Sequence, residues 1–218
     1  MQDKEIITKT YADAGKDMKA FGTAMLNRKL KRIAVIGENR YEWCMTYLGI
    51  TTSGLTIVPL DKLLPSQEIE NLIKRSEADT IVCDKKYIET LKKVKDSKES
   101  NLNTIICMDD IKENGIEYWH DVKEQGEQQL KNGDTKYDNI KIDENKMSIL
   151  LFTSGTTSEA KGVMLSQKNI CVNIEDMATY SKMYDTDTIL SILPLHHTFE
   201  CTISFLYGFY SGVCLAFC

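Results

Sequence analysis

The sequence predicts an α/β fold in which a layered, mostly parallel sheet is flanked by helices. Two observations lead to this class. Short apolar runs, of the kind found in strands buried on both faces, recur along the chain, and longer segments with apolar residues at helical spacing lie between them. Alternation of this kind is typical of a parallel sheet, because parallel strands are joined by crossover connections that usually contain a helix.

The first predicted helix lies near the amino terminus and ends before Arg28. Its apolar residues recur in steps of three and four positions and mark one helical face, which comprises Ile7, Tyr11, Ala14, Met18, Phe21 and Met25. We expect this face to belong to the core rather than to a partner surface. Residues 28–32 are rich in lysine and arginine, and we interpret them as a solvated loop rather than a nucleic-acid-binding patch.

The next segment predicts three buried strands and two helices. Ile33 to Ile36, Leu55 to Val58 and Thr80 to Cys83 suit strands, whereas Tyr41 to Thr52 and Ser66 to Ser76 have helical spacing, with Ser66 expected as the cap of the second helix. Residues 84–147 are polar and charged, and only Thr104 to Met108 is predicted as a strand there. We expect most of that stretch to lie on the surface and to link two halves of the sheet.

A predicted phosphate-binding loop follows the strand Leu150 to Phe152. Gly155 permits a tight turn, Lys161 adds a mobile positive charge, and hydroxyl and amide donors come from Thr153, Ser154, Thr156, Thr157 and Ser158. The run is close to the nucleotide-binding pattern G-x-x-x-x-G-K-[ST]. It does not match, because Ala160 replaces the second glycine and Gly162 replaces the magnesium-binding hydroxyl.

A hairpin and a helix are predicted after this loop. Residues Lys161 to Leu165 suit a second strand, so that strand, loop and strand would form a phosphate cradle. Ser166 is placed to cap a helix that runs to about Tyr184. A further strand begins near Ile189 and runs into Pro194.

Two adjacent histidines follow Pro194 in the run ILSILPLHHTFE. His196 and His197 could be metal ligands or strand-end residues satisfied by backbone hydrogen bonds. A zinc site is disfavoured, because no third histidine or cysteine lies at ligand spacing nearby and His120 is the remaining histidine of the sequence. No metal ligand is therefore assigned.

The last eighteen residues, Cys201 to Cys218, carry no charge. Their length reaches the lower limit for a membrane-spanning helix. Gly208, Ser211 and Gly212 instead divide the run into a helix and a strand. We expect a buried helix and a sheet strand here, with peripheral membrane contact as the disfavoured alternative.

These motifs resemble the adenylate-forming superfamily, which includes acyl-CoA synthetases, luciferases and the adenylation domains of peptide synthetases. The superfamily pattern T-S-G-T-T-G-x-P-K-G corresponds to residues 153–162, with Ser158 at the glycine that follows the two threonines and Ala160 at the proline. The run L-P-L-x-H-x-x-E resembles the fatty acyl-CoA synthetase branch, with His197 at the histidine position. Asn39, Arg40 and Trp43 lie in a stretch similar to the first subdomain of the superfamily, which implies a structural role for them.

The resemblance implies the activity and the site. A carboxylic acid, expected to be a fatty acid, would be activated by ATP as acyl-AMP and passed to coenzyme A, with Mg²⁺ as a further cofactor. Thr153 and Lys161 would be catalytic, and His196 and His197 would line the acid site. ATP would be bound by the residues Thr153, Ser154, Gly155, Thr156, Thr157, Ser158 and Lys161.

The resemblance also implies a domain organisation. Residues 1–147 would form a first α/β part with a polar linker, and residues 148–218 the start of the nucleotide-binding part of a partial N-terminal domain. The adenine loop, the magnesium-binding Thr-Glu pair, the ribose aspartate and the C-terminal lid of the superfamily are not found in this sequence. We therefore expect part of a longer enzyme, inactive alone and prone to self-association through uncovered apolar surface.

Composition limits the alternatives. The 218 residues carry a net charge of −5 and are 42% hydrophobic, which suits a globular, cytoplasmic protein without a nucleic-acid partner. The amino terminus lacks a signal-peptide pattern, and the seven scattered cysteines suit reduced core residues. Two other functions stay open, a non-catalytic nucleotide- or acyl-binding module and an adenylation domain that loads a carrier-protein thiol.

Overall fold

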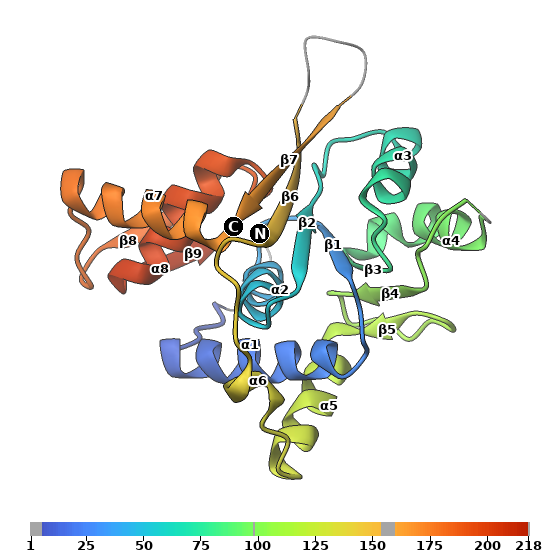
Figure 1. Ribbon diagram of the computed structural model, residues 1–218, viewed down its shortest axis with the longest axis horizontal. Coiled ribbons are helices and arrows are strands. Elements are labelled where there is room, and N and C mark those ends of the chain that lie inside the picture. Colours follow the sequence, from blue (N-terminus) through green and yellow to red (C-terminus); the bar gives the residue numbers. More distant parts are fainter. Residues whose placement is uncertain (1–5, 98, 154–159, 218) are drawn as a thin grey trace.

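A computed structural model describes residues 6–97, 99–153 and 160–217 of the chain (Figure 1). Its main feature is a seven-stranded sheet in the order β5-β4-β3-β1-β2-β6-β7, in which β6 and β7 are antiparallel and the other neighbours are parallel. The α/β class and the mostly parallel sheet are confirmed. The strands are β1 (Arg32–Ile36), β2 (Thr56–Pro59), β3 (Thr80–Cys83), β4 (Thr104–Cys107), β5 (Glu117–Tyr118), β6 (Met147–Thr153) and β7 (Lys161–Ser166).

Helices cover both faces of this sheet. On one side lie α1 (Tyr11–Leu26), α2 (Tyr41–Thr52) and α5 (Trp119–Lys131), and on the other α3 (Ser66–Ser76) and α4 (Ile88–Asp96) (Figure 1). Successive strand residues point to opposite faces. In β1, accordingly, Ile33 and Val35 pack with the first group of helices, and Ala34 and Ile36 pack with the second.

The first helix begins later than its apolar pattern predicts. Thr10 is its N-cap and forms a capping box with Asp13, so the helix starts at Tyr11. Ile7 lies before the helix with 81% of its surface exposed, and its assignment to the core face is wrong. The reason is that the capping box stabilises a helix start at residue 11, regardless of the apolar residue upstream.

The two helices predicted between the first strands have the predicted bounds, but the expected cap of the second is wrong. Pro65 is the N-cap of α3, and Ser66 is its first helical residue. Its hydroxyl lies 3.2 Å from the Thr90 hydroxyl on α4 and makes no capping bond. Proline lacks an N–H group and its fixed φ suits the start of a helix, so the N-cap lies one residue earlier than the serine suggests.

Residues 84–147 are more regular than predicted. They contain a short 3-10 helix, η1 (Lys85–Tyr87), then α4, β4, β5, α5 and a short helix, α6 (Lys136–Asn139). Trp119 and Val122 of α5 are fully buried, and Leu91 and Val94 of α4 are at most 1% exposed. Most residues of the segment are exposed or half-buried, as expected, but it also forms α4, β5 and α5, which the sequence analysis did not predict. The few apolar residues are spaced for one helical face, and the many charged residues occupy the other.

The hairpin and helix predicted after the motif loop are present. Strand β7 pairs with β6, and Ser166 forms a capping box with Asn169 at the start of α7 (Gln167–Tyr180). This helix ends at Tyr180, earlier than the predicted Tyr184. Strands β8 (Thr188–Ser191) and β9 (Cys214–Phe217) then pair in parallel as a separate two-stranded sheet.

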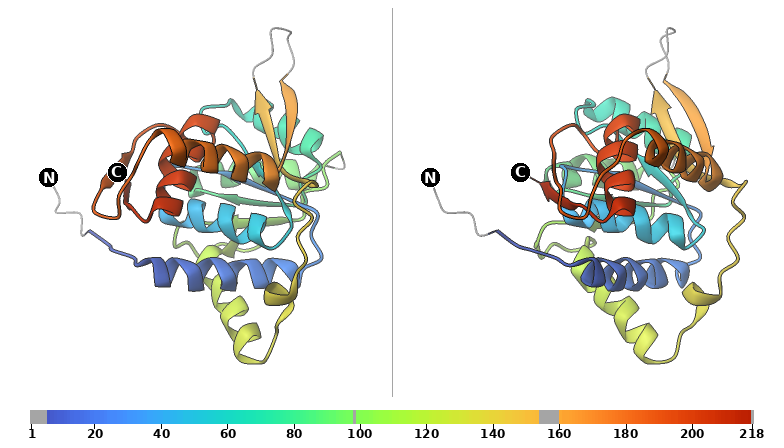
Figure 2. Two further views of the ribbon diagram at one scale, coloured as in Figure 1. Left: turned by 60° about the vertical axis from the view of Figure 1, so that its left-hand side comes forward. Right: turned by 90° about the vertical axis from the view of Figure 1, so that its left-hand side faces the viewer.

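The uncharged carboxyl-terminal run folds as a helix followed by a strand, as predicted. A π-helix, η2 (Glu200–Tyr207), continues into α8 (Gly208–Ser211), and Gly212 ends it with a φ of +80°. Phe205 packs edge-on against Trp43 and Tyr47 of α2, which explains the burial of this segment beside α2 (Figure 2). Within the described ranges, no helix has both the length and the apolar character needed to cross a membrane.

Candidate functional site

The carboxyl ends of the parallel strands meet at one edge of the seven-stranded sheet. After β1, the chain forms β2 on one side of it and then β3 on the other side, so the strand order reverses at β1. Ligands of open α/β sheets bind beyond the carboxyl ends of the strands, near such a switch point. The predicted phosphate loop follows β6, which ends at this same edge.

Thr153 and Lys161 face each other at the ends of two antiparallel strands. They are register partners on β6 and β7, and both are exposed. On β6, the residues from Ser148 to Leu151 are buried or half-buried, so the base of the hairpin is fixed in the sheet. The other predicted nucleotide-binding residues, Ser154, Gly155, Thr156, Thr157 and Ser158, lie outside the residues that the structure describes.

Arg75 of α3 contacts this hairpin next to the predicted loop. Its guanidinium donates to the Ala160 carbonyl oxygen at 2.6 Å and lies 5.6 Å from the centre of the Phe152 ring. The arginine therefore contacts Phe152 of β6 and Ala160, the residue before β7, on either side of the predicted loop. Sequence reasoning missed Arg75, because its contact depends on how α3 packs against β6 and β7.

His196 lies at the same sheet edge through a contact with Asp61. The Nε2 atom of His196 is 3.3 Å from Oδ1 of Asp61, which follows β2. Since β2 is the neighbour of β6, with Ile57 opposite Ile149, this contact brings the second motif to the edge that carries the first. Burial lowers the pKa of His196, and the nearby Asp61 carboxylate opposes that shift without reversing it.

His197 has a different environment from its neighbour. Its side chain is exposed, its backbone N–H donates to the Pro194 carbonyl at 3.0 Å, and its Nδ1 atom accepts a 3.3 Å hydrogen bond from the Phe199 amide. These bonds fix a turn in which His196 faces Asp61 and His197 faces outward. Of the two predicted acid-binding residues, His197 is thus the more accessible, and the role of both stays a prediction.

The residues interpreted as structural form a polar and apolar junction next to this edge. Trp43 is 1% exposed in the core, and Arg40 donates to Asp109 at 2.8 Å and to Glu42 at 2.7 Å. Although burial opposes it, pairing with these carboxylates raises the pKa of Arg40 above its ordinary value. Asn39 bonds to the segment that carries the two histidines.

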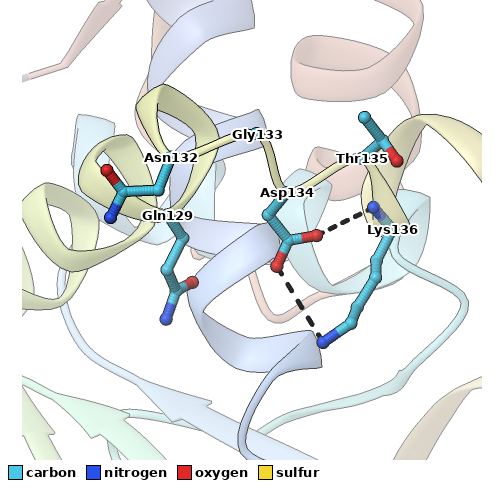
Figure 3. A pocket seen from close by; sticks show the side chains of 6 residues that line it. All are labelled: Gln129, Asn132, Gly133, Asp134, Thr135 and Lys136. Carbon is cyan, nitrogen blue, oxygen red and sulfur yellow. Dashed lines mark hydrogen bonds and ion pairs between the residues drawn. The ribbon is translucent and has the colours of Figure 1, made fainter.

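The described part of the chain also has a depression that lies apart from this site (Figure 1). A shallow depression at the end of α5 (Figure 3) is lined by Gln129, Asn132, Gly133, Asp134, Thr135 and Lys136. There the Asp134 carboxylate accepts hydrogen bonds from the Lys136 amide and from Asn27, so it serves the local loop. Over the residues with described positions, no three histidine, cysteine, aspartate or glutamate side chains cluster as metal ligands.

Comparison with known proteins adds a family. The sequence model described as "AMP-binding enzyme" matches residues 1–218. The chain is 27% identical over 215 residues to a long-chain-fatty-acid–CoA ligase of Rattus norvegicus, and this match covers 88% of the chain and 30% of the relative. The chain therefore spans about a third of the length of the curated relatives it matches.

Solved structures show the same fold. The chain matches a long-chain-fatty-acid-CoA ligase from Archaeoglobus fulgidus with a TM-score of 0.80 at 18% identity, covering 99% of the chain and 42% of that protein. It matches an anthranilate CoA ligase in complex with anthranoyl-AMP with a TM-score of 0.82 at 16% identity, covering 99% of the chain and 40% of that protein.

Proposed function

The chain belongs to the AMP-binding enzyme family, and from this premise we propose that the protein containing it activates a carboxylic acid with ATP. A carboxylate oxygen of the acid attacks the α-phosphorus of ATP, the bond to pyrophosphate breaks, and acyl-AMP forms. The thiol of coenzyme A then attacks the acyl carbon, AMP leaves, and a thioester results. A fatty acid is the proposed substrate, because the matched rat relative is named a long-chain-fatty-acid–CoA ligase.

The observation that carries this proposal is the pairing of Thr153 with Lys161 at the carboxyl edge of the sheet. A hydroxyl and an ammonium group held there by a hairpin can bind the phosphate oxygens of ATP and stabilise the charge that develops on pyrophosphate. Ser154, Gly155, Thr156, Thr157 and Ser158 complete the proposed phosphate site by sequence. Magnesium usually binds enzymes through phosphate oxygens, water and one or two carboxylates, so a carboxylate cage in this part of the chain is not required.

The two histidines are proposed to lie near the acid. His197, exposed in the turn after Pro194, is the proposed contact to the substrate carboxylate, and His196 holds that turn against Asp61.

The proposal also includes the domain division between residues 147 and 148, a cytoplasmic location and self-association of the 218-residue chain. Exposed apolar side chains on its second part, such as Met164 and Ile192, support the last of these.

Acid-dependent exchange of labelled pyrophosphate into ATP tests this function. The assay uses the full-length protein that contains these residues, with acids from acetate to palmitate, and then coenzyme A or a carrier-protein thiol as acceptor. We expect exchange with a fatty acid and thioester formation with coenzyme A. Transfer to the carrier protein alone would favour the adenylation-domain alternative. Nucleotide binding without exchange for any acid would favour the non-catalytic module and refute the proposed activity.

A further inference from the structure

The turn that carries the two histidines has an unusual backbone partner. Pro194 has no N–H group, and β8 ends before it, at Ser191. The side chain of Asn39 bonds on both sides of this proline: its Nδ2 donates to the Leu193 carbonyl at 2.6 Å, and its Oδ1 accepts from the Leu195 amide at 3.0 Å. In a parallel sheet, one residue of a strand bonds to the carbonyl before and to the amide after a residue of the neighbouring strand. One side-chain amide thus replaces a neighbouring strand.

A chain of hydrogen bonds continues from Asn39 into the core. The second Nδ2 proton is directed to the Ser191 hydroxyl at 2.9 Å, and that hydroxyl donates to Oε1 of Glu200 at 2.6 Å. Ser204 donates to the other carboxylate oxygen at 2.9 Å. Ser191 and Glu200 are each 3% exposed. Burial of a carboxylate is costly unless hydrogen bonds satisfy it, so these contacts fix the start of η2 firmly.

The histidine turn is therefore held from both ends. Asn39 binds the backbone that precedes His196. Glu200, which follows His197 in the chain, accepts a hydrogen bond from Ser191, which precedes the turn. Asn39 is half-buried and lies between the buried strand β1 and the start of α2. A rigid anchor of this kind sets the position of a side chain that it does not touch.

We propose that Asn39 is a positioning residue that places His197 for the acid substrate. This inference rests on the proposed function, since His197 contacts the acid in that proposal. Asn39 itself lies in the first α/β part and acts through the Leu193 and Leu195 backbone groups. The simpler possibility is that Asn39 only adds stability, and the experiment must separate the two.

Two variants and a matched control separate these roles. Asn39→Asp keeps the size and the acceptor but loses both donors, and Ser191→Ala cuts the link to Glu200 while sparing the bonds around Pro194. Asn139→Asp is the control, because Asn139 is exposed and bonds within its own short helix. In the full-length protein, we expect Asn39→Asp to lower kcat/KM for the acid about 10- to 100-fold while the KM for ATP is unchanged. Ser191→Ala should give a smaller loss in the same direction, and the control none.

Histidine NMR signals of the 218-residue chain provide a readout that does not depend on catalysis. The sequence has three histidines, so each is assignable. We expect Asn39→Asp to shift the signals of His196 and His197 and to leave that of His120, on α5, unchanged. Unchanged His196 and His197 signals would refute the positioning role. So would equal losses of kcat/KM for the acid and for ATP that parallel a fall in the thermal midpoint. If the unmodified protein shows no acid-dependent exchange, the proposed function fails, yet the NMR result still decides whether Asn39 positions the turn.

Discussion

Nε2 of His196 lies 3.3 Å from Oδ1 of Asp61, which joins the turn after β8 to the end of β2. Two effects compete on this imidazole. Burial disfavours the charged form and is the larger effect, while the carboxylate favours it, so the pKa of His196 is below its ordinary value. Both groups are partly exposed, so solvent weakens the attraction between them.

Removal of the Asp61 charge should lower the pKa of His196 further. In Asp61→Asn, burial continues to act and the opposing carboxylate is gone. The pKa of His196 in the folded state is below its unfolded value of about 6.5. The contribution of His196 to the free energy of unfolding is therefore fully present above about pH 6.5 and is lost as the pH falls through the folded-state pKa. We expect a steeper loss of thermal stability from pH 7 to pH 5 in the variant. NMR titration of His196 and thermal unfolding at several pH values measure both effects. Asp176→Asn, an exposed substitution on α7, is the control, and a raised pKa of His196 in Asp61→Asn would contradict this account.

Gly126 of α5 allows a close approach to α1. A Cβ atom at this position would lie 1.8 Å from the Ala20 carbonyl oxygen, which is backbone and cannot move aside alone. We expect Gly126→Ala to lower the free energy of unfolding by about 2–3 kcal/mol, as overpacking of a core does. Gly15 of α1 is the matched control, since no atom lies within 4 Å of its added Cβ. Gly15→Ala should stabilise by about 0.5–1 kcal/mol through helix propensity. Urea titrations of both variants check the two signs, and equal effects would contradict the contact.

The buried indole of Trp119 depends on Thr46 for its hydrogen bond. Nε1 of Trp119 donates to Oγ1 of Thr46 at 2.9 Å, and both side chains are fully buried. Thr46→Val preserves the shape and leaves the indole N–H without an acceptor, so we expect a loss of about 1–3 kcal/mol in unfolding free energy. Thr179→Val, on the exposed side of α7, should have little effect by the same denaturant measurement. Equal stability of the two variants would show that the bond contributes nothing.

Lys161 should matter to catalysis more than to folding. Its side chain is exposed on β7, so Lys161→Ala should leave the thermal midpoint within error of the unmodified protein. In the full-length protein we expect pyrophosphate exchange to fall about 10²- to 10³-fold, the usual cost of one lost charge-stabilising donor. Lys168→Ala removes an exposed lysine just beyond the hairpin and should keep near-normal exchange. Near-normal exchange in Lys161→Ala would refute the catalytic role of this residue.

Local patterns in the sequence were sufficient for several elements. The apolar runs predicted the parallel strands β1, β2, β3 and β4 but not β5, and helical spacing predicted α2 and α3 with their observed bounds. The second apolar run, Lys161 to Leu165, predicted a hairpin after β6, which is present, and the structure adds the register in which Lys161 lies opposite Thr153. Each of these features depends on neighbouring residues alone, through strand burial, helix periodicity or turn chemistry.

Boundaries and segment 84–147 were less predictable. Pro65 rather than Ser66 is the N-cap of α3, and the capping box at Thr10 excludes Ile7 from α1. Residues 84–147 contain helices although the segment is rich in charged side chains, because a few apolar residues on one face of α4 and of α5 are buried against the sheet. A low average hydrophobicity conceals such a face when no partner surface is known.

The sequence alone determined the fold class, the family resemblance and the chemical character of the two motifs, because these depend on residue type and local spacing. Only the tertiary structure decided that Arg75 contacts the hairpin on either side of the predicted loop, that His196 meets Asp61 and that Asn39 bridges Pro194. These contacts join residues far apart in the chain, and they form because β1, β2 and β6 are neighbours whose carboxyl ends share one edge. Strand order and packing of the second part against α2 place these side chains, and neither is encoded in any single stretch of sequence.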